Sequence, residues 1–216
     1  MAQWLNSAFF NFDRVAFLSM HNLAVNQGGF FTPFLSFITF FGNGGWFPLV
    51  VGVILLLFKK TRKVGFTILL SVGIGALFTN LLIKNAVARA RPYIESSEYN
   101  EWWQFVWGKT ESDLSFPSGH MTCTMAFSTA IFLTCDKKIS WLAFVFAILM
   151  GLSRVYLIVH YLTDVICGGI VGLIGGILGY LLCQLIISLI KKNKENKFCV
   201  FLLEFDLIEI FLKKEK

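Results

Sequence analysis

Long apolar runs alternate with short polar segments along most of this chain. A helix needs about 20 mostly apolar residues to cross the roughly 30 Å hydrocarbon layer of a bilayer. The runs expected to do so lie at about 30–41, 46–58, 64–84, 121–135, 139–159 and 165–190. The first two runs are divided by an expected turn, "GNGG" at 42–45. Both are short and are expected to recruit flanking residues. The pattern predicts an all-α, integral-membrane bundle of six helices.

Three regions follow from this pattern. Residues 1–27 are predicted to form an N-terminal amphipathic segment, because Asp13 and Arg14 interrupt its apolar positions and no basic start marks a signal peptide. We expect an interfacial helix there. Residues 28–190 hold the six-span core, and residues 191–216 form a basic linker and an amphipathic C-terminal tail.

One long polar stretch interrupts the apolar pattern at residues 85–119. A loop of this length is usually functional or disordered. Its tryptophans, Trp102, Trp103 and Trp107, favour an ordered segment at the level of the lipid headgroups.

Five glycines fall close together in the last apolar run. Gly168, Gly172 and Gly176 recur at four-residue spacing, with Gly175 and Gly179 beside them. Small residues at this spacing let two helix backbones approach closely. We expect helix packing there.

Composition supports a membrane protein and argues against other classes. Hydrophobic residues make up 56% of the 216 residues and charged residues 15%, whereas a soluble domain carries about 25% charged residues. The net charge of +6 comes from short clusters between apolar runs, so no nucleic-acid partner is expected. The five cysteines lack C-x-x-C spacing and are expected to pack as small hydrophobes, without a disulfide framework or a metal site.

The distribution of positive charge predicts the orientation of the chain. Six spans place the basic clusters at 59–63, 136–138 and 191–197 on one face. Cytoplasmic loops carry such excess charge, so we expect a multi-pass protein of the cell inner membrane. The 85–119 loop and the turn near residue 160 then share the outer, periplasmic face. Lys84, Arg89 and Arg91 break the charge rule on that face, which calls for a local anionic partner.

Three ionisable clusters are brought to that outer face by the predicted topology. They read "KNAVARARP" at 84–92, "PSGH" at 117–120 and "SRVYLIVHYLTD" at 153–164. Each alone has an ordinary explanation: snorkelling cations, a turn before a helix, or an ion pair between helix ends. Their convergence on one face, where ionisable side chains are expensive, favours a functional site instead.

The histidines supply the reactive groups. His160 and Asp164 are four residues apart, which is one helical turn. A carboxylate there can accept from Nδ1–H and leave the Nε2 lone pair directed outward, as a histidine nucleophile requires. His120, from another span, can serve as the acid and base for the leaving oxygen and for water.

The remaining groups suit a phosphoryl substrate. Lys84, Arg91 and Arg154 supply positive charge for phosphoryl oxygens, and Ser118 with the Gly119 amide can add neutral donors at a helix start. Asp164 is the sole carboxylate in the three clusters, so no Mg²⁺ or Zn²⁺ site is predicted. The pattern indicates phosphoryl transfer by fixed electrostatics.

The same residues carry a family resemblance. Lys-x₆-Arg-Pro at 84–92, Pro-Ser-Gly-His at 117–120 and Ser-Arg-x₅-His-x₃-Asp at 153–164 resemble, in order, the signature motifs of the type 2 phosphatidic acid phosphatase superfamily. The resemblance implies metal-independent and cofactor-independent hydrolysis of lipid phosphates or diphosphates through a phosphohistidine at His160. It also implies Asp164 as its partner and His120 as acid and base. It assigns phosphate binding to Lys84, Arg91, Ser118, Gly119 and Arg154.

The substrate stays open at this point. Small bacterial members of the family with a short N-terminal helix resemble this chain most, which favours undecaprenyl diphosphate, converted to undecaprenyl phosphate. Phosphatidylglycerophosphate, phosphatidic acid and lipid A phosphates remain alternatives, and the oligomeric state is not predicted. Vanadium haloperoxidases share the constellation but are soluble and larger. A non-enzymatic lipid-binding membrane protein would lack one of the two histidines.

Overall fold

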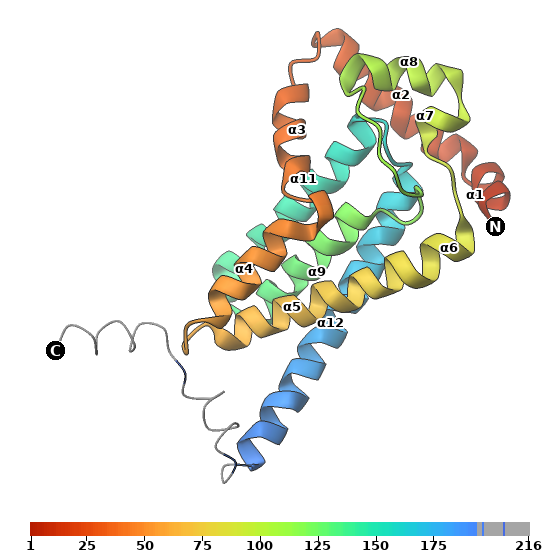
Figure 1. Ribbon diagram of the computed structural model, residues 1–216. Helices are drawn as coiled ribbons and strands as arrows, with labels where there is room; N and C mark the ends of the chain where they lie inside the picture. Colours follow the sequence, from red (N-terminus) through yellow and green to blue (C-terminus); the bar gives the residue numbers. More distant parts are fainter. Residues whose placement is uncertain (194–195, 197–204, 206–216) are drawn as a thin grey trace.

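The computed structural model describes residues 1–193, 196 and 205 (Figure 1), and the expected amphipathic tail lies outside them except for Phe205. Every regular element in this part of the chain is helical. The N-terminal half comprises α1 (Ala2–Ala8), α2 (Phe10–Asn26), α3 (Thr32–Phe40), the 3₁₀ turn η1 (Asn43–Gly45), α4 (Trp46–Leu56), α5 (Arg62–Ala76), the π-helical η2 (Leu77–Ile83) and α6 (Lys84–Val87). The rest comprises α7 (Pro92–Glu95), α8 (Ser97–Val106), α9 (Gly119–Thr134), α10 (Lys137–Ser140), α11 (Leu142–Tyr156) and α12 (Leu162–Lys192).

The first two expected spans are one. Figure 1 shows α3, η1 and α4 following one another in the same general direction, and together they form a single helical run, Thr32–Leu56, of 25 residues. The "GNGG" segment is therefore a kink, with Gly44 and Gly45 at positive φ, and not a hairpin. At 1.5 Å per residue the joined run is about 37 Å long, enough for one crossing, which neither half could make alone.

The count of six separate spans is therefore wrong. Within the described residues, four runs are long and apolar enough to cross a membrane: Thr32–Leu56, Arg62–Glu95, Lys137–Tyr156 and Leu162–Lys192. The fourth expected span, α9, is shorter, with 16 residues, and packs against α5, α11 and α12. The protein is a multi-pass membrane protein with an all-α fold.

Close packing of α12 follows from its glycines, as predicted. A Cβ on Gly172 would lie 2.5 Å from the backbone oxygen of Thr122 in α9. On the other side of α12, a Cβ on Gly179 would lie 2.5 Å from the Ser71 backbone nitrogen in α5. Only the missing side chains let α12 lie between these two helices.

The N-terminal segment is helical, as expected, and docks on protein. Arg14 of α2 pairs with Glu98 of α8 at 2.9 Å, and His21 stacks on Trp102 with ring centroids 4.3 Å apart. Figure 1 shows α1, α2, α7 and α8 gathered at one end of the bundle, with the α4–α5 connection and the end of α12 at the other.

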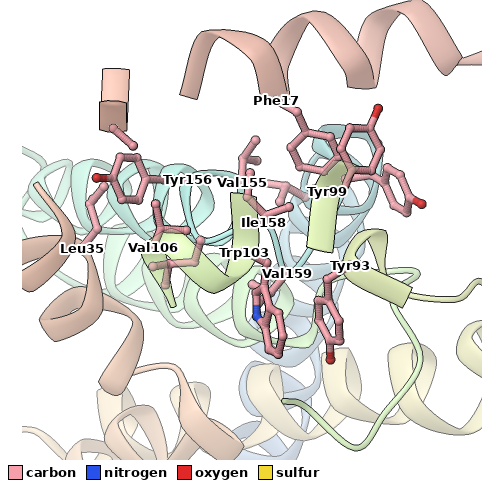
Figure 2. Close-up of a cluster of buried hydrophobic side chains, with 14 of the residues drawn as sticks. Phe17, Leu35, Tyr93, Tyr99, Trp103, Val106, Val155, Tyr156, Ile158 and Val159 are labelled. Carbon is pink, nitrogen blue, oxygen red and sulfur yellow. The ribbon is translucent and has the colours of Figure 1, made fainter. Parts of the chain in front are cut away.

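A buried cluster of aromatic and aliphatic side chains fixes the segments at this end (Figure 2). Phe17 of α2 meets Tyr99 of α8, with ring centroids 4.9 Å apart. Trp103 is buried and stacks on Tyr93 at 4.4 Å, so this tryptophan belongs to the core and is not the headgroup anchor expected. The 85–119 stretch is thus ordered by packing on α2 and on residues 155–159.

The cysteines are less buried than expected. Cys183 is buried, while Cys123, Cys135 and Cys167 are partly exposed, and these four carry free thiols. Cys199 lies outside the described residues.

Candidate active site

One cavity of about 610 Å³ gathers residues of all three ionisable clusters. Lys84, Arg91, Gly119, His120 and His160 line it. They come from α6, the α6–α7 connection, the first turn of α9 and the α11–α12 connection. The predicted convergence of three distant segments is confirmed in the structure.

His160 lies in the tight connection 157–161 between α11 and α12. Ile158 has a φ of +55°, a conformation that β-branched residues rarely adopt, and His160 N donates to the Arg154 carbonyl at 3.3 Å. The side chain is 1% exposed. Burial and then the nearby Arg91 and Arg154 guanidiniums hold the pKa of His160 well below its ordinary value. Both effects favour the neutral imidazole, which carries a lone pair on one ring nitrogen.

Asp164 reaches His160 through Ser115. Its Oδ2 lies 3.6 Å from His160 Nδ1, which is longer than a hydrogen bond. Ser115 Oγ fills the interval, at 2.5 Å from Asp164 Oδ2 and 3.4 Å from His160 Nδ1. Tyr161 N also donates to Asp164 Oδ2, at 3.0 Å. The expected direct carboxylate–imidazole bond is thus replaced by a serine bridge, because His160 precedes α12 and does not lie within its first turn.

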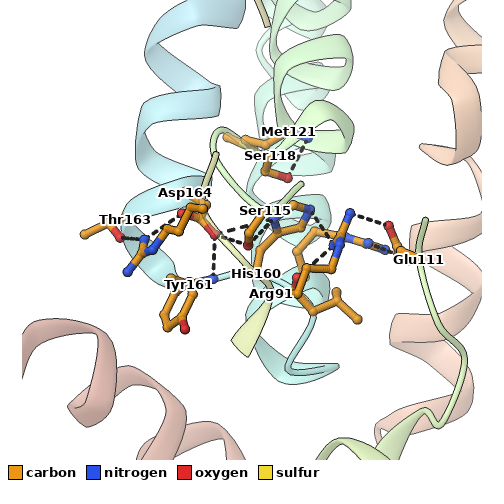
Figure 3. Close-up of polar contacts among 12 residues, drawn as sticks. Arg91, Glu111, Ser115, Ser118, Met121, His160, Tyr161, Thr163 and Asp164 are labelled. Carbon is orange, nitrogen blue, oxygen red and sulfur yellow. Dashed lines mark hydrogen bonds and ion pairs between the residues drawn. The ribbon is translucent and has the colours of Figure 1, made fainter. Parts of the chain in front are cut away.

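Arg91 faces the opposite ring nitrogen. Its Nη1 lies 3.2 Å from His160 Nε2 and donates to the Val159 carbonyl at 2.8 Å. Figure 3 shows Thr163, Asp164, Ser115, His160, Arg91 and Glu111 in a row across the site. Nε2, the ring nitrogen of His160 that would attack a substrate, therefore faces the cations.

Two carboxylates from the 85–119 loop form ion pairs with the cations of the cavity. Glu111 Oε2 lies 3.0 Å from Arg91 Nη2, and Glu111 Oε1 pairs with Arg154. Asp113 pairs with both Lys84 and Arg91. Although burial alone raises the pKa of Glu111, the charges of Arg154 and Arg91 outweigh it and set that pKa below its ordinary value. The sequence motifs do not include either carboxylate.

Arg154 is fully buried beside the cavity. It donates from Nη1 to Thr39 Oγ1 at 2.6 Å. Its buried Nε has no hydrogen-bond partner among the described residues. A guanidinium in this state has donor capacity left for an anion.

His120 is held from the first membrane run. Its Nε2 lies 2.9 Å from Asn43 Oδ1, and its ring packs where a Cβ on Gly42 would stand, 2.4 Å from Cδ2. The kink at residues 42–45 therefore positions this histidine. These residues lie outside the three sequence motifs, where only a turn was expected.

Ser118 lies outside the cavity lining. Its Oγ accepts from Met121 N at 3.5 Å as the N-cap of α9, and its N donates to the Asp164 carbonyl at 3.0 Å. In this structure Ser118 therefore joins two motifs and does not present its hydroxyl to the cavity. Gly119 does line the cavity, and a Cβ there would lie 4.0 Å from Lys84 Nζ.

Arg89 turns away from the cavity. It binds Asp164 and Asp13, at 2.7 and 3.0 Å. In the described part of the chain, protein carboxylates thus pair with Lys84, Arg89 and Arg91. The positive charges at positions 84–91 indicated that anionic partners exist. They did not indicate that Asp13, Glu111 and Asp113 would be among them.

In the described part of the chain, no group of three or more His, Cys, Asp or Glu side chains is placed to hold a metal ion.

Comparison with known proteins agrees with these motifs. Residues 64–192 match the family profile described as the PAP2 superfamily. A curated undecaprenyl-diphosphatase of Sulfolobus acidocaldarius is 33% identical over 127 residues, covering 59% of this chain and 58% of that protein. A lipid A 4'-phosphatase of Bacteroides thetaiotaomicron is 26% identical over 176 residues, covering 76% of this chain and 77% of its own length.

A solved structure shares the fold. The crystal structure of a transmembrane PAP2 type phosphatidylglycerolphosphate phosphatase from Bacillus subtilis superposes with a TM-score of 0.57 at 26% identity. The superposition covers 85% of this chain and 98% of that one. It therefore extends beyond the 64–192 match into the N-terminal helices.

Proposed function

Because this chain belongs to the PAP2 superfamily, we propose that it is a membrane enzyme that hydrolyses a lipid phosphate or diphosphate without a metal ion. The proposal rests on the groups that surround His160 Nε2. This buried atom lies 3.2 Å from Arg91, in a cavity that Lys84 and His120 also line. A neutral imidazole among fixed cations can attack a phosphorus atom whose oxygens those cations hold.

The proposed first step forms a bond between His160 Nε2 and phosphorus. The bond from phosphorus to the lipid oxygen, or to the bridging oxygen of a diphosphate, breaks with its electron pair on that oxygen. His120, as the imidazolium, donates a proton to this oxygen and becomes neutral. Ser115 and Asp164, on the Nδ1 side of His160, stabilise the positive charge that develops on the ring.

In the second step water hydrolyses the phosphohistidine. His120, now neutral, takes a proton from the water, whose oxygen attacks phosphorus while the bond to Nε2 breaks. Inorganic phosphate leaves and His160 returns to its neutral form. Lys84, Arg91 and Arg154 are proposed to hold the phosphoryl oxygens in both steps, with the Gly119 amide as a neutral donor. Of the donors proposed from sequence, Ser118 has the weakest support, since it caps α9.

The wall of the cavity provides a path for a lipid. Besides the charged residues, Leu49 of α4 and Val72, Gly73 and Ala76 of α5 line it. These side chains belong to two runs long enough to cross the membrane. A lipid tail can therefore remain among α4 and α5 while its phosphate reaches His160, so the substrate can approach laterally.

We propose undecaprenyl diphosphate as the substrate and undecaprenyl phosphate as the product. The undecaprenyl-diphosphatase of Sulfolobus acidocaldarius is the relative that supports this choice. The lipid A 4'-phosphatase and phosphatidylglycerolphosphate phosphatase relatives keep those lipid phosphates as alternatives. The three basic clusters follow α4, α9 and α12, which by the positive-inside rule supports a site on the outer face of the inner membrane.

A substrate panel on the purified chain tests the proposal. Phosphate release is measured from undecaprenyl diphosphate, phosphatidylglycerophosphate, phosphatidic acid and lipid A, each in detergent with EDTA and again with Mg²⁺. We expect release in EDTA, fastest with undecaprenyl diphosphate. Activity that depends wholly on Mg²⁺ would reject the metal-free route, and a different preferred lipid would replace the substrate while keeping the reaction.

A further inference from the structure

We propose that Asp13, on the N-terminal helix α2, is a positioning residue for the reaction, acting through Arg89 on Asp164. The proposal rests on the function proposed above. Asp13 lies outside residues 64–192, the segment that matches the family profile. Its effect on the site is therefore a property of this chain's N-terminal segment, not of the shared motifs.

Arg89 is the link between Asp13 and the site. It is 1% exposed, and its Nη1 donates to Asp164 Oδ1 at 2.7 Å and to Thr163 Oγ1 at 2.8 Å. Its Nη2 donates to Asp13 Oδ2 at 3.0 Å, and its guanidinium lies 3.6 Å over the Tyr161 ring. With these contacts Arg89 can orient the Asp164 carboxylate but cannot also hold substrate phosphate.

Asp13 also forms hydrogen bonds with the start of α12. Its Oδ1 accepts from Thr163 N at 2.9 Å, and its Oδ2 accepts from Thr163 Oγ1 at 2.8 Å. Thr163 directly precedes Asp164, and the first N–H groups of a helix have no partner within the helix. Asp13 therefore fixes Asp164 twice, through the charge of Arg89 and through the backbone of the neighbouring residue.

The sharing of Arg89 between two carboxylates links Asp13 to catalysis. Arg89 is shared between two buried carboxylates, Asp13 at 3% and Asp164 at 0% exposure. Without the charge of Asp13, Arg89 would pair with Asp164 alone and draw it from Ser115, which bridges to His160 Nδ1. The carboxylate would then stabilise the developing imidazolium less well. Lys84, Arg91 and Arg154 lie on the other side of His160, so substrate binding should change little.

Asp13→Asn tests the proposal, because it removes the charge and keeps an oxygen for Thr163 N. We expect kcat to fall roughly tenfold, by analogy with the partners that orient metal-binding side chains, whose loss costs about 10- to 100-fold. KM should change less than twofold. In an Arg89→Gln background the same substitution should cost no further factor, because both changes break one connection. An unchanged kcat, or additive losses, would overturn the proposal.

Arg14→Gln is the matched control. Arg14 is the next residue of α2 and ties it to α8 through Glu98, but it does not contact Arg89. If Asp13 only anchors α2, both variants should lose kcat equally, and that result would overturn the positioning role. We expect Arg14→Gln to retain wild-type kcat.

A second variant covers the case in which Asp13→Asn does not fold. Arg89→Lys keeps the positive charge, but one ammonium cannot span both carboxylates as the guanidinium does. It should lower kcat at constant KM, whereas a raised KM with normal kcat would overturn the proposal. Wild-type turnover is measured first: its absence on every lipid counts against the proposed function, while normal turnover in folded Asp13→Asn counts against Asp13 alone.

Discussion

The carboxylate of Glu111 is paired with the guanidinium of Arg154, whose side chain is completely buried, and its other oxygen lies 3.0 Å from Arg91. One carboxylate here pairs with two planar guanidiniums. The same two guanidiniums could hold two oxygens of a phosphoryl group in this way. Glu111 thus occupies the place in which we propose the substrate phosphate binds. The anion must be displaced before a substrate can bind there.

Glu111→Gln should therefore lower KM. The glutamine keeps the shape of the side chain but removes the charge that competes with phosphate, so we expect KM to fall about three- to tenfold, since 1.4 kcal/mol of lost competition corresponds to a factor of ten. Steady-state kinetics with the preferred lipid give KM, and product inhibition by inorganic phosphate should strengthen in parallel.

Glu101→Gln provides the control for this experiment. Glu101 is exposed on α8, so its substitution removes the same charge from the same loop without touching the arginines. KM should stay at the wild-type value. A higher KM in Glu111→Gln would instead mean that Glu111 holds Arg91 and Arg154 ready for the substrate.

The acid limb of the pH–rate profile should lie below pH 6.5, the ordinary pKa of histidine. His160 attacks only when neutral, and burial with Arg91 and Arg154 lowers its pKa, so protonation stops the reaction only at lower pH. Asp164, Ser115, Glu111 and Lys84 are further polar groups that act on its ring or its cations. The measurement is kcat/KM against pH with the ionisation of the substrate determined separately. An acid limb above pH 7 would contradict a neutral His160.

His160→Ala and Arg154→Ala should separate turnover from binding. Removing the nucleophile should abolish phosphate release and leave lipid binding nearly intact, whereas loss of Arg154 should weaken both, because the guanidinium holds the phosphate in ground and transition states. Single-turnover assays and equilibrium binding of the same lipid measure the two properties. Near-normal turnover in His160→Ala would remove the covalent step.

The sequence predicted which distant segments meet better than it predicted the spans. The motifs carry fixed spacings that chemistry requires, so Lys84, His120 and His160 could be brought together from topology alone. Residues 30–58 contain two apolar runs around four polar and glycine positions, and a kink and a hairpin leave the same pattern. Only the packing of the chain distinguishes them.

The partners of the motif residues could not be predicted from the sequence, for a different reason. Ser115 and Glu111 lie in a polar loop without periodicity, and Asp13 is separated from Asp164 by most of the chain. A buried charge such as Arg89 requires a counter-charge, but the sequence does not say which acidic residue provides it. These contacts depend on how the N-terminal segment and the loop fold back over the site.

Gly42→Ala should displace His120 and lower kcat. Gly42 has φ −89° and ψ −15°, which alanine adopts without strain, but its Cβ would lie 2.4 Å from the His120 ring and 3.0 Å from Met150. We expect a loss of kcat on the order of tenfold or more, as general acid–base catalysis contributes about 10²–10⁴-fold. Gly44→Ala is the control: it strains the same kink at φ +57° with nothing within 4 Å. An equal kcat loss in the control would attribute the effect to the kink and not to His120.

Gly172→Ala should destabilise the bundle. The added methyl group would meet the Thr122 carbonyl of α9 at 2.5 Å and Met125 Cβ at 2.8 Å, and neither backbone nor Cβ atoms can move without shifting a helix. Overpacking of this kind costs about 1–3 kcal/mol, which exceeds the gain of about 1 kcal/mol or less in helix propensity from replacing glycine. Gly73→Ala makes the same replacement in α5, where nothing lies within 4 Å of the new Cβ, and should leave stability unchanged or raised. Thermal unfolding of both variants in one detergent gives the comparison, and a Tm for Gly172→Ala at or above that of Gly73→Ala would show that α12 does not need this glycine to pack on α9.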